Sequence, residues 1–452
     1  MKKKILSIVA LVFCIALVLT GCATVSAVQD SNGKPIFFSE AVHFGGNVAQ
    51  IGDYIYYGNA YVATTNEGFS YNDAAKVAYL ARIKNEGSFS FADDVKNVNM
   101  AHSSPEGIEI VNGDKLVGYE NQDMYALGEY LYFTSANVHK TDELENDYTQ
   151  VSLFRVKFDG DGFQEIATFA NDETGEITLQ KGSDGEYYFV AYAPKGDSHA
   201  IYSVKVGNSI GAVKTLAEDV TSAVIADKDS NAKTVIYTVD AGKDFKTTSL
   251  KAVDFATGDD VLLDAGVAGS TTTLIDRVGD RVFYSYTNPD NKVQEVYSKQ
   301  INEENTNISP TEKFYNATSI SNVQPAYNGY VFKTAGGALV YKTLEGVEKL
   351  LLSSSEFTDL LFIDGEYVYT STTSGIKRVN LIDYSSQTIV SDVTMISGEC
   401  GYADGYIFFY AKLGELEVDE EDESDEETDE NYYMYRTDIL GNIQLIGKTA
   451  KK

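Results

Sequence analysis

The hydrophobic positions of this chain follow a repeated pattern of short strands. In residues 361–379, LFIDGEYVYTSTTSGIKRV, an apolar strand leads into a tight Asp-Gly turn, an aromatic strand, a short connection and a third, alternating strand. Alternation with a period of two, bounded by glycine and aspartate, is typical of β-hairpins. After the first 21 residues no stretch keeps an apolar 3.6-residue period long enough to predict a helix. The pattern therefore predicts an all-β protein.

The turn and its aromatic strand recur about eight times. Clear copies are GDYIYY at residues 52–57, GEYLYF at 128–133 and GEYYFV at 185–190, and weaker copies follow as far as DGYIFF, which ends at residue 409. Repeats of this kind indicate arrays, solenoids or propellers. The fifth position of each copy is aromatic or branched and apolar, and these positions are Tyr56, Tyr132, Phe189, Ile236, Phe283, Phe332, Tyr369 and Phe408.

Each repeat contains four antiparallel strands, because an alternating strand and a short apolar strand follow the aromatic strand and another strand precedes the turn. Strands that are apolar on both faces are covered on both faces. Stacking sheets around an axis covers both faces and also shelters the sheet edges. We therefore predict a single β-propeller of four-stranded antiparallel blades over residues 37–448, with eight blades, and with seven as the alternative.

The repeats also resemble a known family. Each repeat has an Asp/Gly turn, a tyrosine-rich strand and a following strand in which an aromatic residue is followed by Arg or Lys and then by glycine. This pattern resembles YWTD-like and TolB-like β-propeller repeats, especially those of uncharacterised bacterial lipoproteins. The tryptophan of the YWTD tetrad is missing throughout, because the chain has no Trp. This resemblance implies a propeller, and it does not imply a ligand.

The N-terminus has the pattern of a lipoprotein signal peptide over residues 1–21. Three lysines at 2–4 precede an apolar segment at 5–19 and the tetrad LTGC, which is the order of regions in a secretory signal. The tetrad resembles a bacterial lipobox, which implies cleavage between Gly21 and Cys22 and lipidation of Cys22. Residues 22–36 are polar and predict a flexible tether. We expect a lipid-anchored, extracytoplasmic protein on the outer face of the bacterial cytoplasmic membrane.

The charge of the chain excludes one class of partner. Its formal net charge is −31, and such a surface repels phosphate backbones, so we expect no nucleic acid partner. The predicted propeller holds one cysteine, Cys400, and therefore no internal disulfide. We expect a monomer that contacts the membrane through its lipid anchor and binds a protein, peptide or glycan.

Four insertions interrupt the repeat, at residues 61–76, 87–119 and 137–150 and in an acidic loop at 413–430. In a four-stranded blade the connections between strands two and three, and those between blades, project from one face. The insertions belong to blades 8, 1 and 2, so we expect all four to gather over one sector of one face. Loops on a rigid scaffold commonly carry binding sites, although neutral loop growth is the alternative because long loops cost little closure entropy.

Motifs of known chemistry are scarce. Residues 207–211 match G-x-S-x-G, but no histidine follows them, so we interpret them as a turn. The acidic loop lacks the glycine and ligand spacing of a calcium loop. The histidines His43, His102, His139 and His199 contain no pair at a metal-binding spacing. We predict no catalytic residue, cofactor or metal site from the sequence.

Three functional interpretations stay open, and in the weakest of them the acidic surface makes the chain a cation-gathering spacer. In the first, the chain is a non-enzymatic binding or interaction module at the cell envelope. In the alternative, it is an envelope hydrolase or lyase that uses carboxylates or tyrosines of the central channel. The lack of a recognisable nucleophile or metal motif favours the first, although propellers serve both roles.

Overall fold

The computed structural model describes residues 28–29, 33–44, 46, 48–59, 77–85, 109–110, 117–118, 123–138, 146–170, 175–225, 232–240, 247–301, 313–391, 393–413 and 433–447. Every regular element in these ranges is a β-strand, so the chain is all-β as predicted. Within the same ranges there is no helix long and apolar enough to cross a bilayer.

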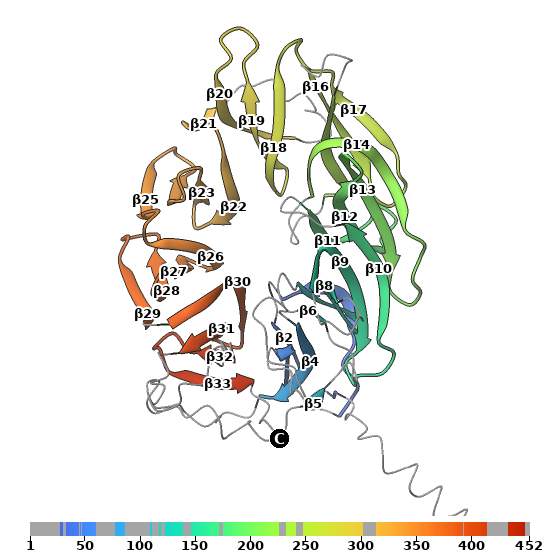
Figure 1. Cartoon of the computed structure of the whole chain (residues 1–452), viewed down its shortest axis with the longest axis vertical. Helices are drawn as coiled ribbons and strands as arrows, with labels where there is room; N and C mark the ends of the chain where they lie inside the picture. The colour runs from blue at the N-terminus through green and yellow to red at the C-terminus, as the bar shows by residue number, and fades with distance from the viewer. Residues whose placement is uncertain are drawn as a thin grey trace, which may run out of the picture.

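Seven antiparallel sheets follow one another along the chain (Figure 1). The first sheet contains β2 (Val48–Ile51), β3 (Tyr54–Asn59), β4 (Val77–Lys84) and β5 (Glu109–Ile110), and β6 (Val117–Gly118) also pairs with β4. The second sheet contains β1 (Phe38–His43), β7 (Met124–Gly128), β8 (Tyr130–Val138), β9 (Asn146–Lys157) and β10 (Gln164–Ala170). The third sheet has seven strands: β11 (Glu176–Lys181), β12 (Tyr187–Lys195), β13 (Ser198–Val206), β14 (Lys214–Val224), β15 (Thr234–Asp240), β16 (Thr248–Asp254) and β17 (Asp260–Asp264).

The remaining four sheets have the four strands that the repeat predicts. The fourth contains β18 (Thr271–Val278), β19 (Arg281–Thr287), β20 (Gln294–Gln300) and β21 (Lys313–Tyr315), and the fifth contains β22 (Ile320–Ala326), β23 (Gly329–Thr334), β24 (Leu339–Thr343) and β25 (Glu348–Leu352). The sixth contains β26 (Phe357–Asp364), β27 (Tyr367–Thr372), β28 (Gly375–Asn380) and β29 (Ser386–Ser391), and the seventh contains β30 (Val393–Ala403), β31 (Tyr406–Leu413), β32 (Tyr433–Thr437) and β33 (Ile443–Gly447).

The repeated apolar positions form the core. All eight fifth-position residues lie on the second strand of their repeat, and none is more than 3% exposed. Most of the hydrophobic clusters join two neighbouring sheets: one connects the first and second sheets, and another connects the fifth and sixth. Burial of apolar area at roughly 25 cal/mol per Å² drives this packing of sheet on sheet.

The sheets follow one another around a common centre in an elongated, propeller-like arrangement (Figure 1). They do not close into the regular propeller of separate blades that the sequence predicts. The first reason is β14, whose first part pairs with β13 and whose last part pairs with β15, so that two predicted blades share one strand. The second reason is β1, which adds a fifth strand to the free edge of β7.

The antiparallel strands give the arrangement two different ends. We call one the turn face: it carries the connections from first to second strand, such as residues 52–53, 365–366 and 404–405, and those from third to fourth strand. We call the other the loop face: it carries the connections from second to third strand. Asn59 pairs with Tyr79 and Val138 pairs with Asn146 at the loop face, and β31 and β32 also leave it.

The predicted insertions are therefore divided between the two faces. Those predicted at 61–76, 137–150 and 413–430 are flanked by strands that end at the loop face, although β8 and β9 extend into the second of them. The segment 87–119 differs from the prediction, because it contains β5 and β6, and because Asn85 and Glu109, the described residues on either side of its first part, lie at the turn face. There, Asn85 N donates to Asp53 O at 2.6 Å, and the returning Glu109 pairs with Arg82. The expectation that all four insertions share one face is wrong for this part.

Neighbouring sheets are joined at the turn face by polar contacts. Asn85 of the first sheet contacts both Arg436 and Asp404 of the seventh, at 2.8 Å each. Between other neighbouring sheets, a basic side chain of one sheet donates to a backbone carbonyl of the next. The bonds run from Arg82 Nη1 to Phe158 O, from Arg155 Nη1 to Gly207 O, from Arg277 Nη1 to Thr234 O and from Lys342 Nζ to Phe314 O. The last sheet therefore lies against the first.

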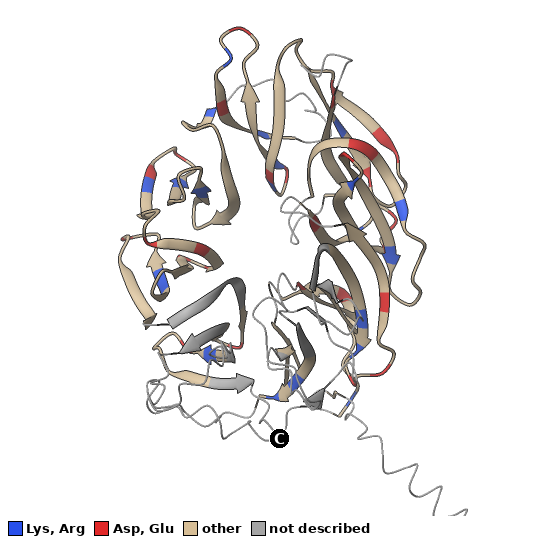
Figure 2. Cartoon of the chain, in the orientation of Figure 1, with Lys and Arg blue, Asp and Glu red and all other residues tan. Residues whose placement is uncertain are grey.

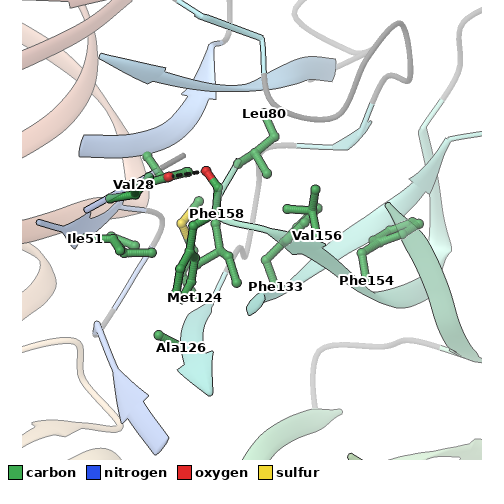
Figure 3. Close-up of a cluster of buried hydrophobic side chains, with 12 residues drawn as sticks. Val28, Ile51, Leu80, Met124, Ala126, Phe133, Phe154, Val156 and Phe158 are labelled. Carbon is green, nitrogen blue, oxygen red and sulfur yellow. Dashed lines mark hydrogen bonds between the residues drawn. The ribbon is translucent and has the colours of Figure 1, made fainter. Parts of the chain in front are cut away.

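The N-terminal segment packs beneath the first two sheets at the turn face. Val28 is 4% exposed and belongs to the cluster that contains Ile51 and Phe158 (Figure 3). Ile36 N donates to Val28 O at 3.2 Å, and a Cβ at Gly52 would meet both side chains. The predicted tether, 22–36, is therefore shorter than expected, because the chain is already packed on the sheets at Val28.

Candidate functional site

A histidine and an aspartate meet at the loop face, where β1 joins the second sheet. The register pairs His43 with Tyr125, and their rings stack with centroids 4.4 Å apart. Asp123 lies just before β7, and its Oδ1 is 3.3 Å from His43 Nε2. The side chains of His43 and Asp123 are 18% and 44% exposed, so a bound molecule can reach this pair. Acid–base and binding sites use such His–carboxylate pairs.

The neighbouring groups hold the pair in place. Asp123 N donates to Thr134 Oγ1 at 3.1 Å, and Thr134 N donates back to Asp123 O at 3.2 Å. Burial, together with the charge of Asp123, raises the pKa of Tyr125 above its ordinary value. Tyr125 therefore stays a neutral ring against which the imidazole packs. His43 Nδ1 is buried and has no hydrogen-bond partner among the residues that the structure describes.

A carboxyl group with a raised pKa lies at the same end of the next sheet. Burial, the charge of Asp276 and, more weakly, that of Asp123 raise the pKa of Glu176 from 4.5 to about 8. Asp276 itself accepts from the backbone N–H groups of Arg277 and Val323, which stabilise its ionised form. Protein atoms crowd around Glu176, although part of its surface still reaches solvent. A carboxyl with this pKa can donate a proton or a hydrogen bond at neutral pH.

The raised pKa of Glu176 predicts a specific pH dependence. A folded-state pKa above the unfolded value gives stability that is present below about pH 4.5 and is lost as the pH rises through about 8. Glu176→Gln removes this titration. We therefore expect the wild-type protein to lose stability relative to the variant between about pH 5 and about pH 8. Urea unfolding of both proteins at the two pH values measures this, and parallel pH profiles would contradict the assignment.

The structure describes only part of what the sequence singled out. Gly21, Cys22, His102 and His139 lie outside the described residues, as do most residues of the insertions. His199 lies at the loop-face end of β13 and stacks on Tyr192, which pairs with Glu176 in the register of β11 and β12. Residues 207–211 lie in the connection between β13 and β14, as the interpretation as a turn predicts.

Sequence reasoning missed the pairing of His43 with Asp123. The two residues are 80 positions apart, and only the addition of β1 to β7 brings them together. The only available signal was the alternating segment at 38–43 just ahead of the first repeat. In the part of the chain that the structure describes, no group of three or more His, Cys, Asp or Glu residues is arranged to hold a metal ion.

Acidic and basic side chains are distributed over many sheets rather than gathered at one (Figure 2). Among the residues that the structure describes, therefore, no single sheet concentrates the charge. Three residues at the loop-face ends of the second and third sheets are distinguished by the contact between His43 and Asp123 and by the raised pKa of Glu176, not by charge density. We call these three residues the rim cluster.

The fold and the rim cluster define an all-β, propeller-like protein, and comparison with known proteins adds little to this class. No protein-family model matches the sequence, and no curated protein matches it. Among solved structures, the chain is similar to a prolyl endopeptidase (12% identity, TM-score 0.44, covering 83% of this chain and 56% of that one). It is also similar to oligopeptidase B from Leishmania major (9%, 0.43, 85% and 55%) and to Saccharomyces cerevisiae Sqt1 (11%, 0.40, 91% and 98%).

The chain thus spans about half the length of the two peptidases that it resembles. At these identities and TM-scores, the activities named for those proteins are not transferred to this chain. Its function has to be argued from its own residues.

Proposed function

We propose that this protein is a lipid-anchored, extracytoplasmic β-propeller that acts as a non-enzymatic binding module at the bacterial cell envelope. The ligand is a protein, peptide or glycan, and it binds at the loop face. The anchor is the lipid attached to Cys22, and the signal peptide ends at Gly21. This assignment rests on the lipobox-like tetrad and on the division of the fold into two faces.

One observation carries the choice of the loop face. The strands that flank the insertions 61–76, 137–150 and 413–430 all end there, in the seventh, first and second sheets. These sheets are neighbours, because β2 contacts both β30 and β7. The rim cluster borders the same end of the second and third sheets. Long loops over a rigid edge, beside hydrogen-bonding groups that water can reach, are the usual composition of a binding surface.

The blade count belongs to the same proposal. The seven-stranded sheet contains two four-stranded units that share β14, and this supports eight units rather than seven. The contact of β2 with β30, and the Asn85 hydrogen bonds to the seventh sheet, support closure of the ring without a shared strand. A closed ring is what keeps the three inserted loops over one sector.

An enzymatic alternative is favoured by one observation, the raised pKa of Glu176 beside the His43–Asp123 pair. Glycoside hydrolysis uses two carboxyl groups, one of which donates a proton. In this alternative Glu176 is the proton donor and Asp123 is the second carboxyl group. Turnover of envelope glycans or peptides that Glu176→Gln abolishes, while binding survives, would favour it over the binding module.

Shortening the loop-face insertions tests the binding module. We expect replacement of residues 62–75, 139–145 and 415–430 by short Gly-Ser links to leave the fold intact, because their flanking strands are paired independently. The same change should abolish cross-linking of the purified protein to envelope components, read by mass spectrometry.

The matched control changes the same face in the sixth sheet, outside the three sheets that carry the insertions. Ser374 lies in the two-residue connection between β27 and β28, and extending this connection by the same Gly-Ser link leaves the three insertions untouched. This control should keep the cross-links. If the shortened protein keeps its partner while the control loses it, the loop-face sector proposed here is not the binding site.

A further inference from the structure

Exposed apolar side chains are concentrated at the turn face. Among the described residues, two of the exposed large apolar side chains lie in connections of the loop face, Val267 and Val293, and three lie on outer strands. The others, nine in number, lie at the turn face. They are Phe37, Val213, Tyr327, Leu344, Val347, Ile382, Tyr384, Ile439 and Leu440.

Three of the four most exposed of these side chains come from three consecutive sheets. Leu344, Ile382 and Leu440 are 67%, 58% and 76% exposed, and each lies in the connection between the third and fourth strands of its sheet. These connections are neighbours. Lys349 Nζ of the fifth sheet lies 4.8 Å from the ring centroid of Tyr384 in the sixth, and the turn at Gly441 packs against Ile389 O of the sixth.

The turns that present these side chains are held rigidly. Asp438 Oδ1 accepts from the backbone N–H groups of Leu440 and Asn442 at 2.8 and 3.0 Å. Asn380 Oδ1 accepts from Ile382 N at 2.7 Å in the corresponding turn of the sixth sheet. The apolar side chains at the tips of these turns are therefore held in contact with water, which is unfavourable in proportion to their exposed area. The turn geometry itself does not require a large apolar residue at these positions.

The N-terminal segment reaches the protein at the same face. Val28 packs beneath the 52–53 turn, and this turn adjoins Asn85, which contacts the seventh sheet. Val28 follows Cys22 by only six positions, with five residues between them. Even fully extended, six residues span at most about 20 Å. A lipid at Cys22 therefore keeps the turn face within that distance of the bilayer surface.

We infer that the turn face rests on the membrane, and that its apolar turns in the fifth, sixth and seventh sheets insert into the headgroup region of the bilayer. This inference rests on the proposed lipid anchor at Cys22. The lipid anchor supplies most of the affinity for the membrane. The turns fix the orientation of the protein, because insertion into the headgroup region buries apolar surface that the anchor alone would leave in water. The loop face and the rim cluster then point away from the membrane.

Charge selects the kind of bilayer that suits this contact. Glu345, Asp383 and Asp438 lie in the same turns as the apolar side chains. Anionic headgroups repel these carboxylates, whereas zwitterionic headgroups do not. The insertion should therefore be stronger in phosphatidylcholine than in bilayers rich in phosphatidylglycerol.

The lack of tryptophan makes the experiment direct, because a single introduced Trp is the only one in the chain. The full, lipidated protein carrying Leu440→Trp is reconstituted into phosphatidylcholine vesicles that contain brominated phosphatidylcholine. The matched control is Val293→Trp, an exposed apolar position at the loop face. We expect a blue-shifted emission and strong quenching for Leu440→Trp, and neither for Val293→Trp.

Each outcome separates the inference from the anchor itself. If the protein does not co-float with the vesicles, the proposed lipidation fails and the inference fails with it. If the protein co-floats but the two variants are quenched alike or not at all, the anchor stands and the inference is overturned. Weaker quenching of Leu440→Trp in phosphatidylglycerol-rich vesicles supports the role of the carboxylates, and stronger quenching there would contradict it.

Discussion

Replacing Arg82 with alanine is expected to lower the free energy of unfolding by about 3 kcal/mol. Arg82 is fully buried, and its Nη1 donates to Phe158 O at 2.7 Å and to Tyr56 OH at 3.2 Å. Its guanidinium also lies over the ring of Tyr54, 4.2 Å from the centroid. The change removes charge-assisted hydrogen bonds between two sheets, removes a cation–π contact and leaves a cavity. Urea unfolding followed by circular dichroism measures the loss.

Two further variants separate packing from polar contacts. Arg82→Met keeps most of the volume, and Phe158 O keeps its hydrogen bond from Tyr56, so we expect a loss of only about 1 kcal/mol. Arg155 occupies the equivalent position in the second sheet, lies over Tyr130 and is partly exposed, so Arg155→Ala should cost about 1 kcal/mol or less. A stability for Arg82→Ala equal to that of the wild type would contradict the proposed link between the sheets.

Replacing Gly375 with alanine is expected to be as damaging, with a loss of about 3 kcal/mol. Gly375 has a φ of +141° and begins β28, where it pairs with Ser391 of the neighbouring strand. A Cβ there would lie 2.0 Å from Val390 O and 2.8 Å from Val390 C. Both atoms belong to the backbone of β29, so the end of this strand pair has to open. Thermal and urea unfolding should both show the loss.

Gly365 is the matched control in the same sheet. It has a φ of +57°, and a Cβ at this position would meet nothing within 4 Å. Gly365→Ala should therefore lower the free energy of unfolding only by the cost of the left-handed conformation, about 1 kcal/mol. If both variants lose the same free energy of unfolding, the loss at Gly375 comes from its backbone conformation alone. The close approach of β28 to β29 at this position would then be contradicted.

The sequence predicted the repeat well, because hydrophobic alternation and turn residues are local signals. Tyr56, Phe283 and Phe408, for example, were aligned by pattern alone, and each is fully buried on the second strand of its repeat. The recurring Arg or Lys on the strand that follows the aromatic strand could also be read from the sequence. Its role could not, because Arg82, Arg155 and Arg436 act on atoms of neighbouring sheets.

The features that the sequence could not predict are those set by long-range pairing. Whether β1 joins the first sheet, the last sheet or β7 depends on which sheet edge is free, and the sequence of residues 38–43 suits any of them. The same holds for β14, which is long enough to pair with a different partner along each half. The rim cluster follows from the position of β1, so it could not be predicted either.

The two faces together give one account of the protein. Val28 of the N-terminal segment and the apolar turns lie at one end of the sheets, whereas the rim cluster and the flanks of three insertions lie at the other. A protein held to the membrane through its turn face would present its loop face to the envelope. Both proposed roles, membrane contact and ligand binding, depend on the last sheet lying beside the first.

Cross-linking between the first and seventh sheets tests this arrangement most directly. Asn85 Nδ2 lies 2.8 Å from Asp404 Oδ2 across 319 residues of chain. In a protein that carries Cys400→Ser, the pair Asn85→Cys and Asp404→Cys should be joined within one molecule by a short bifunctional thiol reagent, and the linked chain should migrate faster in a denaturing gel. The pair Asn85→Cys and Asp290→Cys should stay unlinked. Failure of the first pair to link, although both cysteines react singly, would contradict the account.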